Sequence, residues 1–332
     1  MTRSTALVVA PGRGSYGKAE LGSLRRGGVD LTTYDAIRTA AGKPTLASLD
    51  AAERFSPGLH LSGENAAPLI YAASMADMTA IDPAKVEVVA VTGNSMGWYT
   101  ALAAAGAVSR ENGFRIADAM GVNSGRHGPG GQLVVGLSDD DWRAVPGLRD
   151  HVLALAADTG MRVSIDLGGT LVLAGDEAPL KAFAAQTPVP ATRLAGHGPF
   201  HTPLMADSSA AAMAALPVDW FGNPSVPLID GAGRIWPRWA SAADALWRYT
   251  FAAQILEPYD FARAIQVGVK EFAPDHIILL GPGDALGGGI AQALIGIGWL
   301  AMTSRADFMA RQRSNPFLLA MGRDDQRRMV TA

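Results

Sequence analysis

The feature best suited to covalent chemistry is the pentapeptide GNSMG at residues 93–97. It directly follows the apolar run Val86–Val91 and directly precedes the helical stretch Trp98–Val108. A strand, a tight turn and a helix form the context of a nucleophile elbow, in which glycines on both sides avoid clashes. At a helix N-terminus, unpaired NH groups such as that of Met96 can stabilise an oxyanion formed at an ester or thioester carbonyl. The pattern therefore predicts Ser95 as a nucleophile, and a chance G-x-S-x-G match is the alternative.

A serine hydroxyl becomes nucleophilic only when a base accepts its proton, so a histidine must come from elsewhere in the chain. The candidates are His60, His127, His151, His197, His201 and His276. His201 is favoured because Pro199 and Pro203 fix the backbone around it, and Phe200 can anchor that loop in the core. His197 and His201 have the H-x3-H spacing of a helical zinc site. Pro199 argues against a helix here and no third ligand is evident, so no metal site is predicted.

Short apolar runs closed by Gly or Pro alternate with Ala-rich stretches of helical period. This pattern is typical of an α/β fold with a largely parallel, hydrolase-like sheet covered by helices. The expected strands are Ala6–Ala10, Val86–Thr92, Gln132–Leu137, Thr170–Ala174, Val226–Ile229 and His276–Leu280.

The pattern changes between residues 124 and 198, which predicts a small inserted α+β subdomain. Its expected elements are a Gly-rich entry, a strand, a helix around Asp139–Leu148, two strands around Gly168–Gly169, a helix around Pro179–Gln186 and a strand near Ala191–Leu194. Residues 1–123 and 199–300 would then form the large α/β domain, with a cleft between the two parts. The strand pattern is lost after Trp299. The tail 301–332, with six arginines, is therefore expected to add one or two peripheral helices.

The composition narrows the classes of function. The 332 residues carry 28 Lys and Arg against 31 Asp and Glu, a net charge of -3 that argues against a nucleic acid or an anionic membrane as partner. Cysteine is absent, which excludes disulfides, thiolate metal sites and a cysteine nucleophile. The N-terminal apolar run is too short for a signal segment, and no stretch is long enough to span a bilayer. We expect a cytoplasmic protein.

Several motifs in a fixed order resemble the malonyl-CoA:acyl carrier protein transacylase family over roughly residues 5–300. PGRGS at 11–15 is similar to the family's P-G-Q-G-S, and residues 93–106 are similar to its G-H-S-L-G-E-x-x-A-L-x-x-A-G. FHTPLM at 200–205 and GPGDAL at 281–286 also match, and residues 167–175 look like a hairpin of the family's ferredoxin-like subdomain. The resemblance implies a Ser95–His201 dyad and an oxyanion hole made by the backbone NH groups of Met96 and Arg13. It also implies acyl-CoA and the phosphopantetheinyl arm of an acyl carrier protein as substrates, with no cofactor.

The same resemblance suggests what orients the histidine. In the family a backbone carbonyl near a P-V-x-W segment does so, and this segment corresponds to residues 258–261, PYDF. Asp260 is therefore the expected orienting residue. Either its carboxylate or its backbone could act, and the backbone is favoured.

Departures from the family pattern concern the acyl pocket. Met120 stands where the family has an Arg that pairs with the malonyl carboxylate, and a thioether cannot form that pair. Met120 therefore predicts an acyl group other than malonyl, without a charge, unless Arg13 or Arg126 supplies the cation from another direction. Further substituted positions, taken as candidate substrate-binding residues or neighbours, are Asn94, Trp98, Ala67, Ser164 and Asp166. For Trp98, simple packing is the alternative.

The leading interpretation is ping-pong acyl transfer from acyl-CoA to an acyl carrier protein through acyl-Ser95. A proofreading thioester hydrolase that uses the same covalent step is the second hypothesis. A non-catalytic partner that docks a carrier protein is the third, and retention of Ser95 and His201 argues against it.

Overall fold

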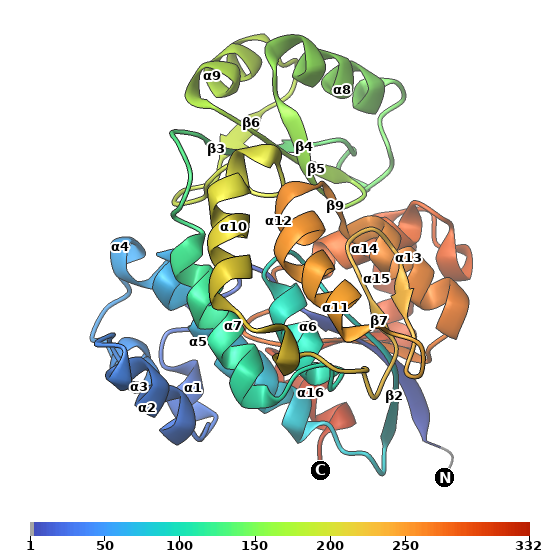
Figure 1. The fold of residues 1–332 in the computed structure, drawn as a ribbon. Coiled ribbons are helices and arrows are strands. Elements are labelled where there is room, and N and C mark those ends of the chain that lie inside the picture. Colours follow the sequence, from blue (N-terminus) through green and yellow to red (C-terminus); the bar gives the residue numbers. More distant parts are fainter. Residues whose placement is uncertain (1–2) are drawn as a thin grey trace.

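The structure is a computed structural model that describes residues 3–332, and within them the larger sheet has six strands (Figure 1). Neighbouring strands are parallel except for β7 and β8, which are antiparallel. The expected α/β fold with a largely parallel sheet is confirmed. In spatial order the strands are β11 (Leu318–Ala320), β10 (His276–Leu279), β1 (Ser4–Ala10), β2 (Val86–Gly93), β7 (Leu228–Ile229) and β8 (Ile235–Trp236).

The central strand β1 is apolar at successive positions because both of its faces are covered. Ala6, Val8 and Ala10 belong to one hydrophobic core, whereas Leu7 and Val9 belong to the other. A strand buried on both faces loses the alternation of polar and apolar residues that a half-exposed strand shows. Helices α5 (Gly63–Ala80), α6 (Gly97–Ala104) and α7 (Arg110–Asn123) contribute to the first core, and α13 (Phe261–Phe272) and α14 (Gly287–Ile295) to the second.

A second sheet forms the small unit at the top of Figure 1. Its elements follow the chain order strand, helix, strand, strand, helix, strand, which is the ferredoxin-like arrangement. They are β3 (Gly131–Gly136), α8 (Leu148–Thr159), β4 (Arg162–Asp166), β5 (Thr170–Gly175), α9 (Glu177–Gln186) and β6 (Ala191–Arg193). A fifth strand, β9 (Tyr259–Asp260), pairs in parallel with β4. Residues far beyond the insertion therefore complete its sheet and join the two units.

The expectation of a helix around Asp139–Leu148 is wrong, because the helix of this region, α8, begins only at Leu148. The Asp139 carboxylate accepts hydrogen bonds from the NH groups of Asp141 and Arg143, which closes a local turn instead. Gly147 has a φ of 72°, which a right-handed helix does not allow, so the helix starts after it.

The tail contains the expected helices, α15 (Arg305–Ser314) and α16 (Asp324–Val330), but also the unexpected strand β11. β11 pairs in parallel with β10, and its central residue Leu319 is fully buried. Arg327 of α16 forms an ion pair with Asp77 of α5. The tail is therefore part of the large domain and its core, whereas the sequence predicted peripheral helices alone.

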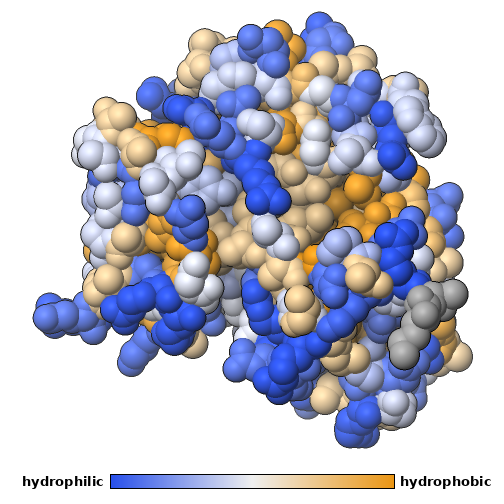
Figure 2. All heavy atoms as spheres, turned by 90° about the horizontal axis from the view of Figure 1, so that it is seen from below, coloured by the Kyte–Doolittle hydropathy of each residue, from blue (hydrophilic) through white to orange (hydrophobic). Residues whose placement is uncertain are grey.

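The remaining helices pack mainly against other helices. They are α1 (Ser23–Arg26), α2 (Thr32–Ala40), α3 (Leu46–Asp50), α4 (Pro57–His60), α10 (Ala206–Ala215), α11 (Ala243–Arg248) and α12 (Gln254–Leu256), with a π-helix at Tyr249–Ala253. Short 3-10 turns occur at Pro203–Met205, Val218–Trp220 and Trp299–Ala301. Across residues 3–332, no helix has both the length and the hydropathy needed to span a membrane. Figure 2 shows hydrophilic and hydrophobic residues interspersed over the face seen from below.

Candidate active site

Ser95 lies in the tight turn between β2 and α6, with a φ of 54° that L-residues rarely adopt. The glycines around it are required by close backbone contacts. A Cβ on Gly93 would lie 2.3 Å from the carbonyl oxygen of Gly97, and one on Gly97 would lie 2.2 Å from that of Ala10. The elbow is therefore pressed against the end of β1, and this packing holds the serine in its strained conformation.

The Ser95 hydroxyl and the His201 ring are distant in sequence but in contact in the structure. Ser95 Oγ lies 2.7 Å from His201 Nε2, and His201 Nδ1 lies 2.7 Å from the carbonyl oxygen of Gln254. A carbonyl can only accept, so Nδ1 carries the proton and Nε2 is left to accept the serine proton. Burial lowers the pKa of His201 to about 4, against the smaller opposing effect of the Gln254 carbonyl. The imidazole is therefore neutral at neutral pH, the state that a general base requires.

The carbonyl that orients His201 belongs to Gln254, four residues before Pro258. In a continuous α-helix this carbonyl would accept a hydrogen bond from the NH of residue 258. Proline has no NH and favours an extended backbone at the residue before it, and Glu257 has the extended ψ of 155°. The helix therefore ends, and the carbonyl stays free for the histidine. Pro258 was the sequence signal that pointed to Gln254, and the sequence analysis missed it.

The side chain of Gln254 also belongs to the site. Its Nε2 donates to the carbonyl oxygen of Ser95 at 3.0 Å, and its Oε1 accepts from the Tyr99 hydroxyl at 3.2 Å. Gln254 thus contacts the backbone of Ser95 with its side-chain amide and the His201 ring with its backbone carbonyl.

The expectation that Asp260 orients the histidine is corrected. Its carboxylate accepts from the NH of Arg263 and caps α13. Its backbone is occupied in the small sheet, where β9 pairs with β4. The group beside His201 Nδ1 is a backbone carbonyl, the kind of group that the sequence favoured, but it belongs to a residue six positions earlier.

The loop that carries His201 is fixed by the small unit. Ser164 of β4 donates to the carbonyl oxygen of Phe200 at 2.8 Å and accepts from Gln132 of β3. Gln132 in turn lies 2.8 Å from Nδ1 of His197. Thr202 donates to the carbonyl oxygen of Pro199 inside the loop. Ser164 was expected to bind substrate, but it holds the loop and does not line the pocket.

Three more of the expected substrate-binding side chains lie outside the pocket. Asp166 forms an ion pair with Arg149. Trp98 is fully buried and donates its indole NH to Thr250. The structure therefore agrees with the alternative that Trp98 packs in the core. Asn94 does not line the pocket, and its side-chain oxygen is buried without a partner in residues 3–332.

The two backbone NH groups expected to form an oxyanion hole are free. Within residues 3–332, neither the NH of Met96 nor that of Arg13 donates a hydrogen bond to a protein atom. Met96 precedes the first residue of α6, so its NH also benefits from the positive end of that helix. Two unpaired donors beside a nucleophile are what a developing oxyanion needs.

A pocket of about 60 Å³ opens beside Ser95 and His201 and is mainly apolar. By the volume that one water needs, it has room for about four water-sized groups. Its other lining residues are Arg13, Ala67, Met96, Tyr99, Met120, Gly121, Ser124, Phe200, Met205, Ser208, Gln254 and Ile255. Met120 and Ala67 thus lie where the sequence placed them, and Arg126, bonded to Asn123, does not line the pocket.

Arg13 brings a guanidinium to the pocket. Its Nη2 donates to the carbonyl oxygens of Leu61 and Gly196, at 2.9 and 3.0 Å, and the group lies 5.3 Å from the centre of the Phe200 ring. Leu61 belongs to the large α/β part and Gly196 to the inserted segment, so Arg13 connects the two. Burial lowers the pKa of Arg13 to about 10, which keeps it charged at neutral pH.

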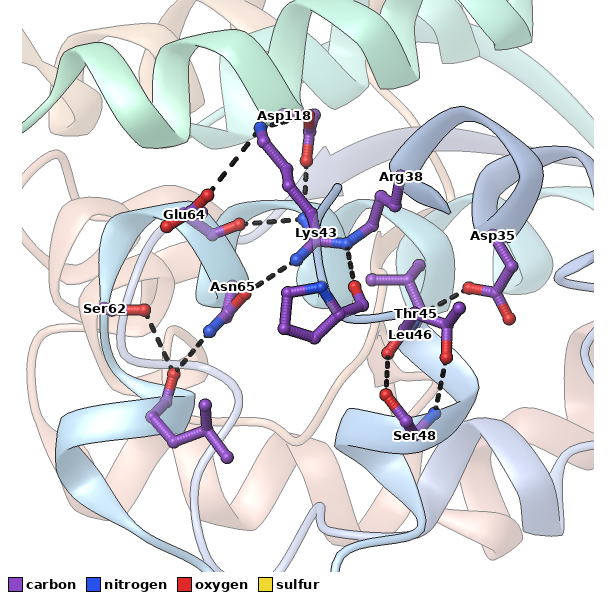
Figure 3. A network of polar contacts seen from close by, with 12 residues as sticks. Asp35, Arg38, Lys43, Thr45, Leu46, Ser48, Ser62, Glu64, Asn65 and Asp118 are labelled. Carbon is purple, nitrogen blue, oxygen red and sulfur yellow. Dashed lines mark hydrogen bonds and ion pairs between the residues drawn. The ribbon is translucent and has the colours of Figure 1, made fainter. Parts of the chain in front are cut away.

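The pocket wall formed by α5 and α7 is braced by a buried ionic network (Figure 3). The Asp118 carboxylate of α7 pairs with Arg38 and with Lys43, and Arg38 also donates to Asn65 of α5. Arg38 is fully buried, and its donors are used by these groups and two backbone carbonyls. Because Asp118 precedes Met120 by two residues, the network fixes the helix that presents Met120.

No protein-family model matches this sequence, and no curated protein matches it either. Solved structures match over almost the whole chain. An acyl-carrier-protein S-malonyltransferase from Burkholderia pseudomallei is 20% identical, covers 98% of each chain and gives a TM-score of 0.75. A malonyl-CoA:acyl carrier protein transacylase from Xanthomonas oryzae is 22% identical, over 98% of this chain and 97% of that one, with a TM-score of 0.71.

A third match is a malonyl-transacylase solved in complex with a type II PKS acyl-carrier protein. It is 19% identical, covers 99% of each chain and gives a TM-score of 0.72. The chain therefore has the fold of the malonyl-CoA:acyl carrier protein transacylases, as the sequence motifs implied.

Proposed function

We propose that this protein is an S-acyltransferase that moves a short acyl group from coenzyme A to the thiol of an acyl carrier protein, through an ester on Ser95. One observation carries the proposal, the 2.7 Å contact between Ser95 Oγ and a buried, neutral His201 whose tautomer is fixed by the Gln254 carbonyl. The shared fold and the carrier-protein complex of a similar transacylase support the choice of acceptor.

The reaction follows from this geometry. His201 Nε2 takes the Ser95 proton as Oγ attacks the thioester carbonyl, and the oxyanion is held by the NH groups of Met96 and Arg13. The C–S bond then breaks, and the imidazolium returns its proton to the departing coenzyme A thiolate. The carrier thiol reverses these steps: it gives its proton to His201, attacks the ester and releases the Ser95 hydroxyl.

The acyl group is proposed to be uncharged. Met120 offers no partner for a carboxylate, and burying a carboxylate without a matching cation is costly. Arg13 is the charged side chain that lines the pocket, and both hydrogens of its Nη2 are directed to backbone carbonyls. Each bidentate fork of a guanidinium includes that nitrogen, so Arg13 has no such fork left for a carboxylate. The small volume supports an acyl chain of a few carbons.

The test is intact-mass detection of an acyl adduct after mixing with acetyl-, propanoyl-, butanoyl- and malonyl-CoA, followed by addition of a holo acyl carrier protein. We expect an adduct that disappears in Ser95→Ala, and transfer of the acyl group to the carrier. Absence of an adduct with every donor would refute the proposal. Release of mostly free acid with the carrier present would favour the thioester hydrolase instead.

A further inference from the structure

The acyl pocket contains one hydroxyl without a partner. Ser208 lies in the first turn of α10 and is 1% exposed, and its Oγ makes no hydrogen bond within residues 3–332. The other uncharged polar side chains of the pocket are engaged. Ser95 contacts His201, the Tyr99 hydroxyl donates to Gln254, and Ser124 donates to the carbonyl oxygen of Gly121. Ser208 is thus the uncharged polar side chain of the pocket that has no partner.

A buried hydroxyl without a partner is costly, because it has lost its bonds to water and gained none in the protein. Native structures satisfy nearly all such groups, so an unpaired one beside a nucleophile calls for a ligand atom. The neighbouring Ser209 shows the contrast: its Oγ donates to the carbonyl oxygen of Phe251. Ser208 faces the pocket from the same helix and has no such carbonyl.

The side chains that share the pocket with Ser208 determine what kind of ligand atom fits. Met120, Met205 and Ile255 are apolar, and Arg13, the charged side chain of the lining, already gives its Nη2 to two backbone carbonyls. A single hydroxyl could not offset the desolvation of a carboxylate. A hydroxyl or keto oxygen, in contrast, needs one hydrogen bond, and a serine can either donate or accept it. The space for about four water-sized groups limits the ligand to a short chain.

We propose that Ser208 is a specificity-determining residue that hydrogen-bonds an uncharged oxygen on a short acyl group, of the 3-hydroxyacyl or 3-oxoacyl class. The inference rests on the proposed acyl-Ser95 chemistry. It adds that the acyl group carries an oxygen, which Ser208 recognises. An acyl group without that oxygen leaves Ser208 unpaired, and this penalty separates the two kinds of substrate.

The experiment compares matched acyl groups in single-turnover acylation of Ser95. Butanoyl-CoA is set against 3-oxobutanoyl-CoA and both enantiomers of 3-hydroxybutanoyl-CoA. We expect at least one oxygenated donor to acylate the protein about 10-fold faster than butanoyl-CoA, which is the effect of one uncharged hydrogen bond. Ser208→Ala should abolish that ratio by slowing the oxygenated donor while butanoyl-CoA keeps its rate or gains.

Ser209→Ala is the matched control, because it removes the adjacent hydroxyl, which points away from the pocket, and it should keep the ratio. Equal rates for all four donors, or a ratio that survives Ser208→Ala, would overturn the inference and leave acyl transfer intact. Malonyl-CoA is tested as a fifth donor. If it is preferred, and Arg13→Gln removes that preference while Ser208→Ala does not, the polar group of the substrate binds the guanidinium, and the inference is overturned. Failure of every donor to form an adduct would instead refute the proposed function, and the inference with it.

Discussion

At the scale of single residues, the site depends on which ring nitrogen of His201 carries a proton. The Gln254 carbonyl selects the Nδ1–H tautomer, and burial keeps the ring neutral, with a pKa of about 4. The nearby His197 is shifted in the same direction, to a pKa of about 3, by burial and by the Arg13 charge. Neither imidazole is therefore charged at neutral pH.

The pH dependence of acylation follows from the lowered pKa. General-base catalysis needs neutral His201, so the acylation rate should stay near its plateau from pH 7 to about pH 5. It should fall as the pH approaches about 4, where the ring becomes protonated. Single-turnover acylation at a series of pH values measures this. An inflection near the ordinary histidine value of 6.5 would contradict the environment described for His201.

At the scale of elements, the two parts of the dyad are positioned by the ends of regular structure. Ser95 follows β2, and the carbonyl for His201 is free where α12 ends at Leu256, two residues before Pro258. Backbone NH and carbonyl groups at the ends of helices have no partner within the helix, so they are available to contact reacting groups. The small sheet adds the third support, since Ser164 of β4 holds the loop next to His201.

Pro258 offers a test at this scale. Pro258→Ala supplies an NH and removes the bias of Glu257 toward an extended backbone. The helix can then continue, and the new NH competes with His201 for the Gln254 carbonyl. We expect Ser95 acylation to slow by about 10-fold, the effect of roughly one hydrogen bond, while thermal unfolding changes little. Pro237→Ala, at an exposed proline after β8, is the control and should leave the rate unchanged. An unaltered rate in Pro258→Ala would show that the freed carbonyl is not important.

At the scale of the whole molecule, segments distant in sequence complete both sheets. β11, near the C-terminus, extends the large sheet beside β10, and β9 extends the small one beside β4. Arg13 links the two units by binding the carbonyls of Leu61 and Gly196. These long-range contacts unite the two units around the pocket.

Residues of the tail that are buried in the large sheet should therefore contribute to stability as core residues do. Leu319→Ala, at a fully buried position of β11, is expected to lower the free energy of unfolding by about 2–5 kcal/mol. Met329→Ala in α16, at a residue that is 44% exposed, should change it by less than about 0.5 kcal/mol. Urea unfolding of the two variants measures the difference. Two near-neutral variants would mean that the tail is only loosely attached.

The features of this protein that depend on adjacent residues could be predicted from the sequence. The G-x-S-x-G turn located Ser95, the apolar runs located most strands, and the prolines around His201 marked a rigid loop. Each of these signals is a property of adjacent residues: backbone freedom, periodic burial or a fixed φ. The order of strands and helices also sufficed to predict the inserted α+β unit.

Which distant groups come into contact depends on how the whole chain folds. Asp260 and Gln254 lie six positions apart, and which carbonyl reaches His201 depends on where a π-helix and a proline leave an acceptor free. Trp98, Ser164 and Asp166 looked like pocket residues by position, yet they face the core, the histidine loop and an arginine. Ser208 gave no signal at all, because being unpaired is a property of every surrounding atom and not of the residue itself.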